Sequence, residues 1–126
     1  MPQKIYPIDA FTDEVFSGNP AAVCPLENWL SDALLQKIAL ENNLAETAFY
    51  VRHHHHIEIR WFTPTIEVDL CGHATLAAAY VLFNYEGFLG NTITFHSPRS
   101  GTLTVTQNNT LLTLNFPTDV LQVTII

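Results

Sequence analysis

The stretch Glu67-Val-Asp-Leu-Cys-Gly-His-Ala-Thr-Leu-Ala-Ala-Ala-Tyr80 decides how the rest of the chain must be arranged. It starts as a short strand-like run, turns at Gly72 and passes into an apolar, alanine-rich segment, residues 74–83, that predicts a buried helix. A helix that begins at Gly72 leaves its first backbone N–H groups without intrahelical partners, and a glycine there lets a ligand approach the backbone closely. We therefore expect an anion-binding site at this turn.

Two side chains near this turn are candidates for moving a proton. His73 faces the positive end of the predicted helix dipole, which favours a neutral imidazole that can pass a proton in either direction. Glu46 begins an otherwise apolar strand and is expected to be partly desolvated, although a surface residue at a strand end would read the same way. If both elements end on one side of the sheet, these groups and the free N–H groups predict proton transfer at a carbon next to a carboxylate.

Composition limits the class of protein. The chain has 126 residues, enough for one domain, and 48% of them are hydrophobic, which indicates a packed core. Only 13% are charged, so we expect another domain or subunit to cover part of the surface. A net charge of -7 with five basic residues argues against nucleic acid and membrane as partners. Two cysteines, no signal-like N-terminus and no membrane-spanning run favour a cytoplasmic protein.

The remaining pattern predicts a mixture of strands and one further helix. The N-terminal part is expected to form a strand over residues 4–11, a loop over 12–20 and a short buried strand over 21–24. A helix should start at an N-cap, Ser31, and stop near Asn43. Further strands are expected over residues 44–51, 57–62, 91–96, 101–106 and 110–116, the last three as a meander, with a strand-like tail over 119–126.

Four consecutive histidines, His53 to His56, lie between two of these predicted strands. Imidazoles at i and i+2 of a strand share a face, so a metal site is one interpretation. A metal site also needs a third ligand and supporting hydrogen bonds, which nothing nearby in the sequence supplies. We therefore favour a solvated hairpin tip and expect no metal.

Several motifs together resemble those of the phenazine-biosynthesis PhzF-like family. They occur in the same order as in that family and span residues 4–117; they are Ile8-Asp-Ala-Phe-Thr12, Phe16-Ser-Gly-Asn-Pro-Ala-Ala-Val23, Asn43-Leu-Ala-Glu-Thr-Ala-Phe49, Arg60-Trp-Phe-Thr-Pro64 and Glu67-Val-Asp-Leu-Cys-Gly-His-Ala-Thr-Leu-Ala77. The resemblance implies an α+β fold like that of diaminopimelate epimerase. In that fold each of two similar halves wraps a mixed or antiparallel sheet around a central apolar helix, here residues 72–83.

The same resemblance implies a cofactor-independent isomerase that uses no metal. Glu46 would shuttle a proton on a small carboxylate-bearing substrate with the help of His73. Asn19 and the backbone of Gly72 and Ala74 would contact the substrate.

The chain departs from the family pattern in its length, because family members carry a second half that closes the substrate site. Residues 1–126 are therefore expected to be one domain equivalent to the N-terminal half, completed either by a C-terminal half or by a second copy in a homo-oligomer. Two alternatives stay open. Cys71 is a further candidate, since related racemases and epimerases place a catalytic cysteine there, although a cysteine before a helix more often packs. The other alternative is a non-catalytic half domain or truncated product that acts as an assembly module.

Overall fold

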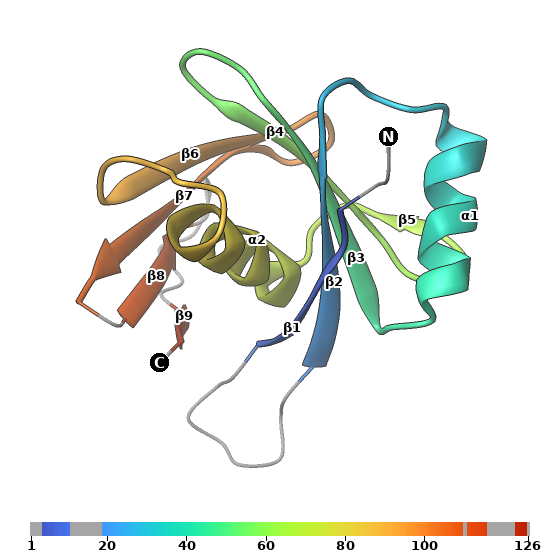
Figure 1. Cartoon of the computed structure of the whole chain (residues 1–126), viewed down its shortest axis with the longest axis horizontal. Coiled ribbons are helices and arrows are strands. Elements are labelled where there is room, and N and C mark those ends of the chain that lie inside the picture. The colour runs from blue at the N-terminus through green and yellow to red at the C-terminus, as the bar shows by residue number, and fades with distance from the viewer. Residues whose placement is uncertain (1–3, 11–18, 110, 116–122, 126) are drawn as a thin grey trace.

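The computed structural model describes residues 4–10, 19–109, 111–115 and 123–125. Two helices and nine strands occupy this part of the chain (Figure 1). In chain order they are β1 Tyr6–Ala10, β2 Asn19–Leu26, α1 Asp32–Asn42, β3 Glu46–Arg52, β4 Ile57–Phe62, β5 Glu67–Val68, α2 Gly72–Asn84, β6 Thr92–Ser97, β7 Gly101–Asn108, β8 Leu111–Asn115 and β9 Val123–Ile125.

The strands form one sheet that curves around α2 (Figure 1). Their order across the sheet is β1-β2-β3-β4-β6-β7-β8-β9, with β5 attached to β4. The β2–β3 and β4–β6 pairs are parallel, and the other pairs are antiparallel. Because α2 contacts β1, β2, β3 and β8, strands from both ends of the sheet enclose it. The predicted α+β class, a mixed sheet around a central helix, is confirmed.

Small side chains allow α2 to sit inside the sheet. Its buried residues are Ala74, Thr75, Leu76, Ala77, Ala78, Ala79, Val81 and Leu82, whereas Tyr80 is exposed. Alanines let neighbouring backbones approach, and the leucines and Val81 fill the space towards the strands. Side chains from one face of the sheet pack against this helix, among them Ala48 and Tyr50 of β3 and Ile59 and Trp61 of β4. The main core therefore lies between α2 and the concave face of the sheet.

The second helix, α1, packs on the opposite face of the sheet. Ser31 caps it, because its Oγ accepts a hydrogen bond from the N–H of Leu34 at 3.2 Å. At the other end Asn43 adopts the left-handed conformation with φ of 52° and donates its N–H to the carbonyl of Ala39. Leu35 is buried with Ala39 in a second, smaller core. The predicted cap and stop are confirmed.

Some predicted boundaries were wrong. The loop expected to extend to Pro20 ends earlier, since β2 already starts at Asn19 and pairs with β1 through Ala10↔Asn19. A proline is tolerated at the start of a strand, where its missing N–H removes few ladder bonds. The rest of that loop, residues 12–18, lies outside the described residues, as does residue 11 at the end of the first predicted strand. The predicted meander is confirmed as β6–β7–β8, and the predicted tail strand is present as β9, which pairs with β8.

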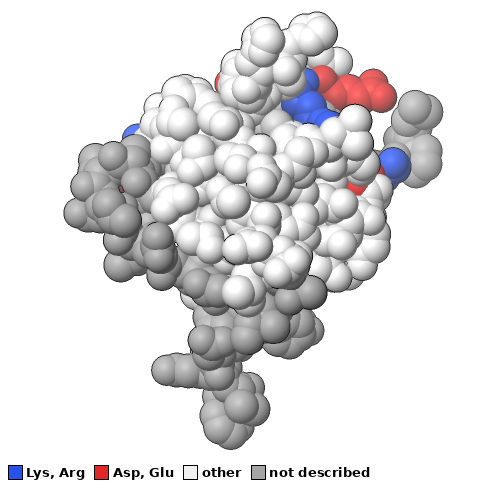
Figure 2. All heavy atoms as spheres, turned by 90° about the vertical axis from the view of Figure 1, so that its left-hand side faces the viewer, with Lys and Arg blue, Asp and Glu red and all other residues white. Residues whose placement is uncertain are grey.

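The described part of one face carries few charged side chains. Figure 2 shows the side that lies on the left of Figure 1, where β6, β7 and β8 are found, and most described atoms there belong to uncharged residues. Neither described helix has the length and hydropathy needed to span a membrane.

Candidate active site

Strand register brings Glu46 to the end of the sheet at which α2 begins. Glu46 is the first residue of β3, and the next residue, Thr47, pairs with Phe62 of β4. Phe62 in turn pairs with Glu67 of β5. Only residues 69–71 separate β5 from α2. The start of β3 and the N-terminus of α2 therefore lie at the same end of the sheet, which is the condition that the sequence argument required.

The contact between Glu46 and this helix end is made through Cys71, the N-cap residue of α2. The pKa of the Cys71 thiol is raised from 9.0 to about 11, chiefly by burial and in addition by the charge and hydrogen bond of Glu46, while hydrogen bonds from the backbone N–H groups of Ala74 and His73 act in the opposite direction. The thiol is therefore protonated at neutral pH and lies between the carboxylate and the helix end.

One carboxylate oxygen of Glu46 has no partner among the described residues. Its Oε2 atom is buried and accepts no hydrogen bond from any of them. Leaving a buried carboxylate oxygen unpaired is costly, so native proteins normally satisfy such an atom with a protein group, a water or a ligand. Within the described part of the chain, the Oε2 atom of Glu46 is thus an acceptor available to a further donor.

Trp61 is a residue that the sequence analysis missed. Its indole Nε1 is also buried with no hydrogen-bond partner in the described ranges, and the residue is 1% exposed. Trp61 pairs with Ala48, which lies two residues after Glu46 and therefore on the same face of β3. The sequence could not reveal this unpaired N–H group, because only the tertiary packing shows whether the indole of a tryptophan in a strand finds an acceptor.

The first turn of α2 supplies backbone donors. The carbonyl of Cys71 accepts the N–H of Thr75 at 3.1 Å and the Thr75 hydroxyl at 2.7 Å, which fixes where the helix starts. The N–H groups of Gly72, His73 and Ala74 precede this first intrahelical bond and have no acceptor within the helix. His73 is half-buried in this turn, and Ala74 is fully buried.

The remaining candidates from the sequence are Asn19 and the four consecutive histidines. The backbone of Asn19 opens β2, but its side chain lies outside the described residues. The four histidines are exposed at the tip of the β3–β4 hairpin, as expected, and Nε2 of His53 lies 2.6 Å from Oε1 of Glu58. Over the described ranges, no group of histidine, cysteine and carboxylate residues could hold a metal ion.

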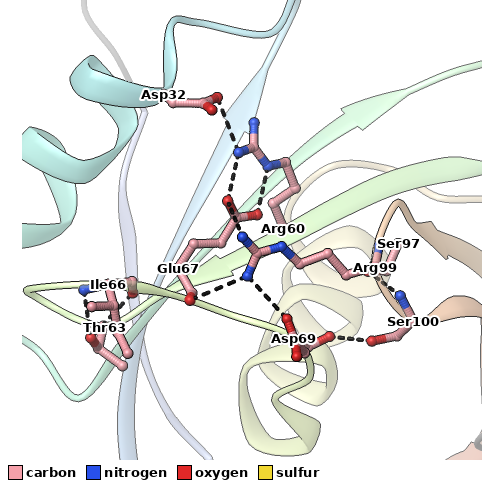
Figure 3. A network of polar contacts seen from close by, with 9 residues as sticks. All are labelled: Asp32, Arg60, Thr63, Ile66, Glu67, Asp69, Ser97, Arg99 and Ser100. Carbon is pink, nitrogen blue, oxygen red and sulfur yellow. Dashed lines mark hydrogen bonds and ion pairs between the residues drawn. The ribbon is translucent and has the colours of Figure 1, made fainter.

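A partly buried ion pair that the sequence analysis did not identify supports β5. Arg60 of β4 donates two hydrogen bonds to the Glu67 carboxylate, at 2.8 and 2.7 Å (Figure 3). Asp32 at the start of α1 lies 3.1 Å from the same guanidinium group, which also stacks over the rings of Trp29 and Phe62. Two parallel hydrogen bonds between a guanidinium group and a carboxylate fix the relative orientation of the two groups as well as their distance. This ion pair holds β5, and hence the segment that leads into α2, against β4.

We expect the alkylation rate of Cys71 to rise with pH up to about 11, because only the thiolate reacts. Replacing Glu46 by glutamine removes the negative charge beside the sulfur, so the midpoint should move to lower pH. Iodoacetamide labelling followed by mass spectrometry over a pH series measures both curves. Cys24, fully buried and with a pKa raised by burial to about 12, is the slow internal control. A midpoint that Glu46→Gln leaves in place would show that the carboxylate and the thiol do not interact.

Comparison with known proteins places the chain in a family. The model of the phenazine biosynthesis-like protein family matches residues 8–122. An uncharacterized isomerase of Pseudomonas aeruginosa is 51% identical over 117 residues, which are 93% of this chain and 45% of that protein. The crystal structure of a PhzF-family phenazine biosynthesis protein of Enterococcus faecalis superposes with a TM-score of 0.84 at 54% identity, covering 90% of this chain and 44% of that one.

A more distant structure shares the fold alone. A predicted epimerase of Pseudomonas aeruginosa superposes with a TM-score of 0.72 at 23% identity, over 90% of this chain and 42% of the other. The chain thus spans less than half the length of the relatives that it matches. The matched residues include every segment that builds the site described above. From the family match and the two close relatives it follows that this chain belongs to the phenazine biosynthesis-like, PhzF-type family.

Proposed function

We propose that this chain is the N-terminal half of a cofactor-independent isomerase that moves a proton on a small carboxylate-bearing substrate. The observation that carries the proposal is the buried, unpartnered Oε2 atom of Glu46 at the N-terminal end of α2. A desolvated carboxylate with a free lone pair is suited to take a proton from carbon. The names of the close relatives, which include uncharacterized isomerases, agree with this class of reaction.

The proposed roles follow from what each group offers. The substrate carboxylate would accept hydrogen bonds from the N–H groups of Gly72, His73 and Ala74, which have no acceptor within the helix and lie where the helix dipole favours an anion. Glu46 would take a proton from a carbon beside a C=C bond of an unsaturated substrate, the electron pair of that C–H bond would form a new C=C bond as the existing one shifts, and Glu46 would return the proton to the carbon at the far end of the shifted bond. The His73 imidazole would assist this transfer, and Asn19 would contact the substrate.

A second half would complete the site. The relatives are more than twice as long as the region they share with this chain, which supports a missing C-terminal half. The low charged fraction and the face with few charged side chains in Figure 2 also suit a covered surface. A second copy of the chain in a homo-oligomer is the other way to supply the same wall. We also propose that residues 1–126 form one domain that corresponds to the N-terminal half of such a two-domain isomerase.

The Cys71 alternative is less well supported. A racemase thiol has to act as a base, yet the pKa of about 11 at Cys71 keeps it protonated near neutral pH. Its neighbour Glu46 opposes formation of the thiolate. The position of Cys71 suits a thiol that donates to the carboxylate better than one that attacks a C–H bond.

The proposal can be tested by solvent exchange with a chimera. Residues 1–115 would be fused to the C-terminal half of the Enterococcus faecalis protein, which is 54% identical over the shared region. The probes are a panel of small 2-amino, 2-hydroxy and unsaturated carboxylates in deuterated water, and proton NMR follows the loss of C–H signals. We expect the chimera to exchange at least one probe, and the chain alone to do so only at concentrations at which it self-associates. A folded chimera that exchanges none would support the non-catalytic assembly module instead.

A further inference from the structure

We propose that Arg99 is a positioning residue, which clamps the segment between β5 and α2 and so sets where the N-terminus of α2 lies relative to Glu46. The clamp is a property of this chain. Its consequence for catalysis rests on the proposed function.

Arg99 reaches this segment through several contacts (Figure 3). Its Nη1 atom donates to Oδ1 of Asp69 at 3.0 Å and to the backbone carbonyl of Glu67 at 3.4 Å. Its Nη2 atom lies 3.7 Å from Oε1 of Glu67. The neighbouring Ser100 adds a hydrogen bond from its hydroxyl to the carbonyl of Asp69. Two consecutive residues of one turn therefore hold both backbone and side-chain groups of residues 67–69.

These contacts join distant parts of the chain. Arg99 and Ser100 lie in the turn between β6 and β7, about thirty residues after the segment that they hold, whereas Arg60 and Glu67 are only seven residues apart. After Asp69 only Leu70 and Cys71 precede α2, and Leu70 is 43% exposed. Consecutive Cα atoms are about 3.8 Å apart, and Cys71 lies only two residues after Asp69. Holding Asp69 in place therefore also limits the positions that Cys71 can take.

The turn that presents Arg99 is itself well fixed. Ser97 is 2% exposed, and its Oγ accepts hydrogen bonds from the N–H groups of Arg99 and Ser100, both at 3.2 Å. Gly101 then has φ of +84°, a conformation that favours glycine, and pairs with Ser97 to start β7. Because internal hydrogen bonds and the buried Ser97 fix this turn, the turn can hold residues 67–69 in a defined position.

The clamp is suited to setting position more than to stabilising the fold. The side chains of Arg99 and Asp69 are 47% and 81% exposed, and exposed ion pairs contribute little to stability. Glu67 keeps its two hydrogen bonds from Arg60 when Arg99 is lost. Removing the Arg99 side chain should therefore leave the fold intact while releasing residues 69–71.

The test is the alkylation rate of Cys71 in Arg99→Ala, measured on the chain with iodoacetamide at pH 8. We expect the rate to rise by at least about threefold, because local release exposes the half-buried thiol more often. Arg52→Ala is the matched control, since the exposed Arg52 donates to the carbonyl of Glu86 beyond the other end of α2, at 2.9 Å. It should leave the rate unchanged. Asp69→Asn should act in the same direction as Arg99→Ala, and Arg99→Lys should restore part of the protection.

Three outcomes would contradict the clamp. An unchanged rate in both Arg99→Ala and Asp69→Asn would overturn it, as would an equal rise in Arg52→Ala. A rise that Cys24 shares, together with a lower Tm, would show that Arg99 stabilises the whole fold instead. In the chimera, Arg99→Ala should lower the exchange rate at saturating probe more than it raises KM. If Cys71 is released but Glu46→Gln leaves exchange intact, the clamp stands and the proposed function fails.

Discussion

Replacing Glu46 by glutamine should reduce exchange of the substrate's carbon-bound proton with deuterated water by at least about 100-fold, the usual scale for losing a general base. Glutamine has nearly the same shape but cannot accept the proton. Because Oε2 of Glu46 has no partner in the described part of the chain, an amide group there breaks no hydrogen bond to those residues at that atom. The variant should fold normally, so the loss would report on chemistry. Proton NMR of the chimera and its variant in deuterated water measures it.

Cys71→Ser is the comparison that separates the two enzyme hypotheses. If Glu46 moves the proton, a serine hydroxyl can still donate to its carboxylate, and most of the exchange should survive. If the Cys71 thiol were the base, this variant would lose exchange and Glu46→Gln would keep much of it. Equal rates in the wild type and in Glu46→Gln would remove Glu46 from the mechanism.

Replacing Leu82 by alanine should lower the free energy of unfolding by about 2–5 kcal/mol, the range for emptying a packed core position. Leu82 is fully buried on α2, enclosed by the curved sheet, and a rigid sheet closes a cavity poorly. For a domain of this size the loss corresponds to a fall in Tm of roughly 6–20 °C. Thermal and urea unfolding followed by circular dichroism measure both quantities.

Leu89→Ala is the matched control. Leu89 is 91% exposed, so the same substitution should leave Tm nearly unchanged. A cost at Leu82 as small as that at Leu89 would mean that the sheet does not pack tightly on α2. That result would also remove the reason why the N-terminus of α2 has a fixed place, because the helix would be free to shift inside the sheet.

Local patterns in the sequence determined the elements of this protein. The alanine-rich run after Gly72 predicted α2, and the Ser31 cap and the Asn43 stop gave the limits of α1. Alternation of apolar residues predicted the β3–β4 hairpin and the β6–β8 meander. These features depend on helix propensity, capping and side-chain period, which act between residues close together in the chain. Glu46 and the Gly72 turn were site candidates from their local sequence, and the family motifs then led to the fold.

Tertiary structure alone decided which distant groups meet. The parallel β2–β3 and β4–β6 pairings, the contact of Glu46 with Cys71 and the unpaired Nε1 of Trp61 have no local signature in the sequence. The same is true of Arg99, whose partners lie about thirty residues away. Such contacts depend on strand order and on the direction of each side chain once the sheet has closed around α2. The sequence therefore determined which residues could do chemistry here, and packing determined which of them lie together.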